Sequence, residues 1–246
     1  MTMDRAVLTA DAAEDLECRI EPVTADNPLS DEEAETLPAW WPLLAGLNAT
    51  QSTELILTQW DSALPGVLPR FQRYLADHGR SSLSRIASEG YRGIAILYVF
   101  NPPDEDPIYL VGYPPTMESP ALVAELPESV QTFYTKIHDG LLNQVEGEPA
   151  GVYQSRRLID LRSWVGDSVL RYLSDPPANP PLAGNLIMFY SDGAGGYIFI
   201  NRGQQDSAVW TAGAGLLDDE SDGGTMTLWD VVGDWITLFV SADSEM

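Results

Sequence analysis

The chain has 246 residues, of which 44% are hydrophobic, and it carries 37 acidic against 13 basic side chains, a net charge of −24. This charge opposes direct binding to nucleic acid phosphates and to anionic membrane surfaces. No apolar run approaches the roughly 18 residues of a membrane span. The single cysteine, Cys18, excludes an intrachain disulfide. We therefore expect one or two packed domains in a cytoplasmic protein whose partner is another protein.

The N-terminal third predicts a leader followed by helices. Residues 1–29 are acidic and lack hydrophobic periodicity, which predicts a flexible leader. Ser30 and Glu33 have the spacing of a capping box. The short helix that they begin is expected to end near Trp40 and Trp41, because Pro38 and Pro42 cannot donate to a helix ladder. Further helical segments are expected at 52–61, 67–78 and 81–89.

A β-hairpin is expected next, because the period of the apolar residues changes. Residues 93–100 form a compact apolar run, 101–107 contain three prolines and three acids, and 108–113 read as the returning strand. A second proline-rich stretch follows and marks a boundary. The chain is thus expected to divide into the leader, an N-terminal subdomain of helices and a hairpin at 30–120, and a second domain at 121–246.

The second domain is expected to begin with a helix and to end with one. Leu126 and Pro127 form a helix entry, and Asp139-Gly140 a helix stop. Residues 186–190 and 197–201 predict a strand pair around a glycine-rich turn, and 208–211 predict a third strand. An acidic loop follows at 218–224, and an amphipathic helix closes the chain at 228–239.

No residue pattern in the chain predicts catalysis, a metal or a cofactor. His78 and His138 each lie near the end of an expected helix, where a structural role is typical. Cys18 has no neighbouring ligands for zinc, and no nucleophile elbow is present. The turn at 191–196 lacks the lysine of a phosphate loop and favours a tight hairpin with positive φ angles. The acidic loop does not match an EF-hand, so weak divalent binding is only an alternative to partner binding.

The acidic residues are segregated along the chain. Residues 1–36, 101–150 and 191–246 together hold 30 acids and four bases. This arrangement favours an exposed anionic patch that meets a basic partner, while a purely solubilising surface is the alternative. Any tryptophan exposed beside the acidic loops is a candidate for the centre of such an interface. The preferred contact residues are Asp192, Asp206, Asp218, Asp219, Glu220 and Asp222.

The second domain resembles the SUKH superfamily, which includes the Smi/Knr cell-wall regulators. Residues 126–140 resemble the opening helix of the family, and 185–201 are similar to its central hairpin. A strand with Trp210 and the closing helix complete the same order. The resemblance implies an α+β fold with a mostly antiparallel sheet flanked by helices, here with an N-terminal helical and β-hairpin extension. The residues that match the family motif are Leu126, Pro127, Tyr134, Asp139, Gly140, Gly193, Gly195 and Tyr197, and the resemblance implies that they determine the fold.

The resemblance also implies a function. Bacterial members are chiefly immunity proteins that bind and silence a toxin domain, and fungal relatives act as regulatory scaffolds. An acidic protein suits a toxin with a basic cleft, because it covers the cleft and associates quickly. We therefore expect an immunity protein for a cognate toxin, without catalytic residues. The alternatives are a regulatory or scaffolding protein that recruits a basic host partner, and an enzyme that uses Asp192 or Asp218 as an acid or base.

Overall fold

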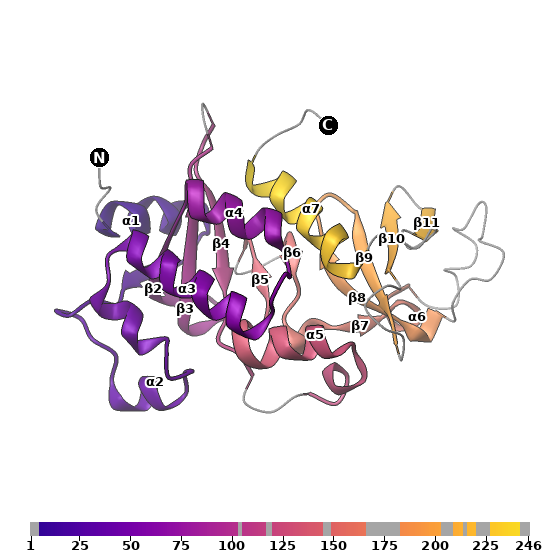
Figure 1. Ribbon diagram of the computed structural model, residues 1–246, viewed down its shortest axis with the longest axis horizontal. Helices are drawn as coiled ribbons and strands as arrows, with labels where there is room; N and C mark the ends of the chain where they lie inside the picture. Colours follow the sequence, from indigo (N-terminus) through magenta and orange to yellow (C-terminus); the bar gives the residue numbers. More distant parts are fainter. Residues whose placement is uncertain are drawn as a thin grey trace.

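The computed structural model describes residues 5–102, 105–116, 120–144, 149–165, 183–202, 209–213, 216–219 and 227–241. This part of the chain has an α+β fold in which eleven strands form one sheet and every strand pair is antiparallel (Figure 1). The predicted fold class, a mostly antiparallel sheet flanked by helices, is confirmed. The strands are β1 (Arg19–Pro22), β2 (Gly79–Ala87), β3 (Arg92–Phe100), β4 (Ile108–Gly112), β5 (Leu141–Leu142), β6 (Gly151–Val152), β7 (Ile159–Asp160), β8 (Leu186–Ser191), β9 (Tyr197–Asn201), β10 (Val209–Gly213) and β11 (Leu216–Asp219).

The strands follow the order β1-β2-β3-β4-β5-β6-β8-β9-β10-β11, and β7 pairs with β8. The longer helices cross the sheet, and Figure 1 shows α3, α4 and α7 in front of it. The helices are α1 (Arg5–Asp15), α2 (Asp31–Glu35), α3 (Ala49–Ala63), α4 (Pro69–His78), α5 (Glu128–Thr132), α6 (Leu161–Val165) and α7 (Leu228–Ser241). A π-helix at Phe133–Ile137 extends α5.

The sheet separates two hydrophobic cores. In β3 the even-numbered residues from 94 to 100 belong to one core and the odd-numbered residues from 95 to 99 to the other, as the alternation of side chains along a strand requires. Trp60 of α3, Phe71 of α4 and Val232 of α7 pack into the first core. Leu16 of the N-terminal segment and Leu161 of α6 pack into the second. Both faces of the sheet are therefore buried against helices.

Local capping explains where two of the helices begin. The Ser30 hydroxyl accepts a hydrogen bond from the Glu33 backbone at 3.2 Å, and the Glu33 carboxylate accepts one from the Ser30 backbone at 2.8 Å. This is the predicted capping box. Asn48 and Gln51 form a second one at the start of α3.

The N-terminal segment differs from the flexible leader that the sequence predicts. Residues 5–15 form α1, and β1 pairs with β2 with Ile20 opposite Ile86. Ala12, Leu16 and Ile20 are buried in the second core. The acids of this segment occupy the exposed positions between these apolar ones, and they conceal the weak apolar stripe in the sequence.

The helical turns predicted at 81–89 are wrong, because most of this stretch belongs to β2. The segment is poor in large apolar residues, and Ser81, Ser82 and Ser84 are buried. The Thr53 hydroxyl lies 3.1 Å from the Ser81 hydroxyl, and the hydroxyls of Ser82 and Ser84 are 3.3 Å apart. Buried serines with hydrogen-bond partners replace the apolar alternation that usually identifies a strand.

The predicted hairpins are present. β3 and β4 pair around the proline-rich connection, and β8 and β9 pair around the glycine-rich turn. Two-residue strands, β5 and β6, join these hairpins into one sheet. The first core also contains residues from both sides of position 120, with Trp60 and Phe133 6.0 Å apart between ring centroids. The two parts that the sequence predicts thus share a sheet and a core.

Candidate functional site

The turn between β8 and β9 is held by the side chain of Asp192. Its Oδ1 accepts hydrogen bonds from the backbone of Ala194 at 2.7 Å and of Gly196 at 2.8 Å. Gly193 and Gly195 have φ angles of +76° and +98°, which only glycine adopts without strain. The expected tight turn is therefore present. The side chain of Asp192 is exposed to solvent and also accepts the hydrogen bonds that hold the turn.

An exposed tryptophan lies beside this turn. Trp164 of α6 is 41% exposed, and its ring centroid is 4.6 Å from that of Tyr197 in an edge-to-face contact. Tyr197 is the first residue of β9 and follows the turn directly. Partly exposed tryptophans that rest on a buried aromatic ring are typical of the centre of a protein interface. We call Trp164, Tyr197 and Asp192 the α6–turn surface.

Of the other predicted contact residues, the structure describes the backbone of Asp218 and Asp219. Asp218 and Asp219 end β11, where they pair with Thr211 and Trp210, and the structure describes only their backbone. The register continues from Thr211 to Ile198 in β9. Two strand spacings, roughly 10 Å, thus separate the backbone of Asp218 from the strand that follows the turn. Asp206, Glu220 and Asp222 lie outside the described residues.

The residues from which the sequence resemblance was drawn make local contacts in the fold. Leu126 is buried, and Pro127 directly precedes α5. The buried Tyr134 hydroxyl donates to the Tyr153 carbonyl at 2.7 Å, and the Asp139 carboxylate accepts from the Ser155 backbone at 2.8 Å. At Gly140 the φ angle is +98°, and a Cβ there would lie 2.8 Å from the Gln154 backbone nitrogen.

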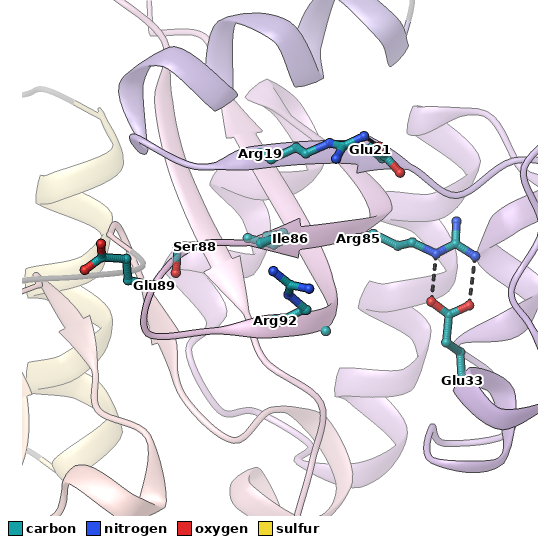
Figure 2. A pocket seen from close by; sticks show the side chains of 10 residues that line it. Arg19, Glu21, Glu33, Arg85, Ile86, Ser88, Glu89 and Arg92 are labelled. Carbon is teal, nitrogen blue, oxygen red and sulfur yellow. Dashed lines mark hydrogen bonds and ion pairs between the residues drawn. The ribbon is translucent and has the colours of Figure 1, made fainter.

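A large pocket lies at the opposite end of the strand order, on β1, β2 and β3 (Figure 2). Its volume is about 860 Å³, and it holds three of the 13 bases of the chain. We call it the arginine pocket. Its lining residues are Arg19, Glu21, Glu33, Arg85, Ile86, Ala87, Ser88, Glu89, Arg92 and Gly93.

Arg85 and Glu33 form one wall of the arginine pocket. The guanidinium of Arg85 donates two hydrogen bonds to the Glu33 carboxylate, at 2.7 and 2.8 Å, and a third to Asn27 Oδ1 at 3.0 Å. Hydrogen bonds from Arg85 lower the pKa of Glu33 to about 2. Both charges are thus satisfied inside the protein. The sequence contains one signal of this pocket, because residues 37–100 are a stretch in which bases outnumber acids, five to four.

A smaller pocket of about 300 Å³ contains the single lysine of the chain, Lys136, which lies on the π-helix. Trp40 forms an aromatic side of this pocket. The complete lining is Pro38, Trp40, Gln59, Ser62, Ala63, Pro115, Thr135 and Lys136. It is mainly apolar and uncharged apart from the lysine.

Exposed acids occur on many elements of the described chain. Besides Asp192 they include Asp11 and Asp15 of α1, Glu32 of α2 and Asp77 of α4. Neither the arginine pocket nor the smaller pocket is lined mainly by acids. Neither of these two pockets is therefore the concave anionic patch that the sequence hypothesis requires.

His138 is fully buried in the first-core side of the sheet and is not available to a substrate. Its Nε2 lies 2.6 Å from the Tyr98 hydroxyl, and its Nδ1 lies 3.2 Å from the Tyr113 carbonyl. The carbonyl can only accept, so Nδ1 carries the proton and Nε2 accepts from Tyr98. Burial lowers the pKa of His138 to about 3 and raises the pKa of Tyr98 well above its ordinary value.

His78, the second histidine, is exposed and lies against Tyr74, with 4.6 Å between ring centroids.

Within the described ranges, no group of three or more His, Cys, Asp or Glu side chains is placed to hold a metal ion. Among the helices that the structure describes, none combines the length and the apolar character of a bilayer span.

Comparisons with protein-family models, with curated proteins and with solved structures found no match to this chain.

Proposed function

We propose that this chain binds and neutralises a cationic protein partner through the α6–turn surface. The observation that carries the proposal is the exposed Trp164 ring, which rests on Tyr197, the residue that follows the turn held by the exposed Asp192. A rigid aromatic ring with apolar support and a neighbouring charge is the arrangement in which a few residues supply most of the binding free energy.

The charge of the chain defines the partner. Residues 191–246 hold ten acids against one base, and the whole chain carries −24. Summed over the molecule, this charge attracts a basic protein and speeds the encounter, although exposed acids on several elements do not by themselves select a docking site. In this proposal the aromatic contact determines where the partner docks, and the acids determine which partner approaches.

The resemblance of residues 126–240 to the SUKH superfamily narrows the proposal to an immunity protein in the cytoplasm. The partner is then a toxin domain with a basic active-site cleft, and binding excludes its substrate. The direct test is to purify the chain with the toxin encoded by a neighbouring gene, and to measure both the dissociation constant and the residual toxin activity. A cognate toxin that neither binds nor loses activity contradicts the proposal, and binding without loss of activity supports a scaffolding role instead.

Two variants locate the interface. Trp164→Ala is expected to weaken binding at least about tenfold, the scale of a hot-spot truncation. Leu43→Ala is the matched control, because Leu43 is the other large apolar side chain with high exposure in the described chain, 60%. Equal effects of the two substitutions would place the interface elsewhere.

Charge reversal tests the electrostatic part of the proposal. Asp218→Arg together with Asp219→Arg should slow association at low salt, and the difference from the wild-type chain should shrink as salt is added. Asp11→Arg together with Asp77→Arg, at exposed positions of α1 and α4, is the control for the same change in total charge. Salt-insensitive binding of the wild-type chain would assign the interface to apolar contacts.

A further inference from the structure

Three strands place two arginines in one row across the arginine pocket. Arg19 of β1 pairs with Ala87 of β2, and Ala87 pairs with Arg92 of β3. Paired residues of neighbouring strands lie on the same face of a sheet, and two strand spacings separate the two arginine backbones by roughly 10 Å. Because the residue between them is alanine, the space above the row is open. Figure 2 shows the Arg92 side chain in the centre of the pocket.

The three arginines of the pocket differ in what already holds them. Arg85 is committed to Glu33 and Asn27, as the dashed lines of Figure 2 show for the carboxylate. Arg19 pairs with Glu21 on its own strand, and both side chains are largely exposed, at 78% and 41%. For Arg92 no ion pair exists within the described part of the chain.

Donors on Arg92 and Arg19 are therefore available to a ligand. An exposed ion pair contributes about 0–1 kcal/mol, so Arg19 exchanges Glu21 for a ligand group at little cost. A guanidinium presents its N–H groups as a planar fork that fits the two oxygens of a carboxylate or a phosphate. The bidentate pair of Arg85 and Glu33 remains in place and acts as the fixed wall.

We infer that the arginine pocket binds a ligand through one oxyanion, a carboxylate or a phosphate group, held between Arg92 and Arg19 above Ala87. The pocket volume of about 860 Å³ has room for the rest of a small molecule. The net charge of −24 does not prevent this, because at physiological ionic strength charges beyond about 8 Å are screened. Three acids of the pocket, Glu21, Glu33 and Glu89, are matched in number by its three arginines, so local contacts with Arg92 and Arg19 outweigh the distant acids. This inference is independent of the proposed toxin interface, which lies at the other end of the strand order.

Inorganic phosphate is the probe for the test, titrated into the full chain at constant ionic strength. The backbone amide signals of Ala87, Ser88 and Arg92 should shift in nuclear magnetic resonance spectra and should saturate, while sodium chloride at the same ionic strength leaves them in place. A second titration with acetate identifies the group. A response to both anions assigns the pocket to oxyanions in general, and a response to phosphate alone assigns it to phosphorylated ligands.

Substitutions connect the response to the two arginines. Arg92→Gln should abolish the saturable shift, and Arg19→Gln should weaken the affinity about tenfold, the scale of one charge-assisted contact. Arg73→Gln, an exposed arginine of α4 that does not line the pocket, should leave the titration unchanged. The spectra of the variants report folding in the same experiment. The inference is overturned if neither anion gives a saturable shift, or if Arg92→Gln responds like the wild-type chain.

Discussion

His138 shows how far a single residue can be interpreted from the sequence. Its place after a helix predicted a structural role, and the structure agrees, but the physical cause is burial among aromatic rings instead of a helix terminus. Trp41, Trp60 and Tyr98 each have ring centroids within 6 Å of the imidazole. Each of these residues lies at least 40 positions before His138 in the chain, so no local pattern could have predicted their meeting.

We expect His138 to lower the stability of the protein in acid. Its pKa is about 3 in the folded protein against 6.5 as an ordinary histidine, so between these values the unfolded chain binds a proton that the folded chain does not. The free energy of unfolding therefore begins to decrease as the pH falls below about 6.5, and the decrease due to His138 reaches about 2–3 kcal/mol near pH 4.5. Urea unfolding at pH 7.0 and 4.5 measures it.

His138→Gln removes this proton and is the comparison for the acid experiment. When the pH falls from 7.0 to 4.5, both chains lose stability through the titrating groups that they share. The wild-type chain should lose about 2–3 kcal/mol more than the variant, because only the wild-type chain has the buried histidine. The imidazole signals of the wild-type chain should also keep their neutral positions at pH 5. Parallel pH profiles, or an imidazole that titrates near pH 6.5, would contradict a buried neutral histidine.

At the scale of elements, the sequence predicted helices and hairpins well where they carry a local signal, such as a capping box or paired apolar runs. It predicted strands poorly where the buried side chains are polar. Ser30 with Glu33 and the paired apolar runs of the two hairpins are local patterns, and all three elements are present. β2 was mistaken for helix because its buried serines hide the alternation. The arginine pocket was missed for a similar reason, since only the register of β1, β2 and β3 brings its residues together.

We expect Glu33→Ala to lower the free energy of unfolding by about 1–2 kcal/mol, because Glu33 closes the capping box of α2 and also fastens that helix to β2 through Arg85. The pair is partly exposed, at 24% and 29%, so the effect stays below that of a buried pair. This contribution is present above pH 4.5 and is lost as the pH falls toward about 2, where Glu33 takes up its proton. Chemical denaturation at pH 7 measures the difference.

Glu32→Ala is the matched control for this prediction. Glu32 is the exposed neighbour on the same helix, and its removal should change the stability by less than about 0.5 kcal/mol. If the two substitutions have equal effects, the contact between Glu33 and Arg85 does not stabilise the fold.

At the scale of the whole molecule, the sheet continues across the boundary that the sequence suggests. Composition and the proline-rich stretches predict a division near residue 120, yet β4 pairs with β5 beyond it, and α4 packs against α7. Leu68 approaches Gly233 so closely that a Cβ at the glycine would lie 3.4 Å from it. Boundary signals describe the local chain, whereas the shared core depends on contacts between segments about 160 residues apart.

We therefore expect a fragment of residues 121–246 to lack a cooperative unfolding transition when it is produced alone. Its separation exposes the face of Phe133 that Trp60 covers and the side of α7 that packs against α4. Circular dichroism during thermal unfolding of the fragment and of the whole chain tests this. A sharp transition of the fragment, similar to that of the whole chain, would show that the predicted second domain folds independently.

Lys136 has a practical consequence for work with this protein. It is the only ε-amino group among 246 residues, and it is exposed on the rim of the smaller pocket beside Trp40. An amine-reactive fluorophore attached there reports from one known position, close to an indole whose emission it can receive. Apart from the α-amino group, Lys136 is the one amine through which the molecule couples to a sensor surface, so neither the α6–turn surface nor the arginine pocket carries a side-chain attachment point.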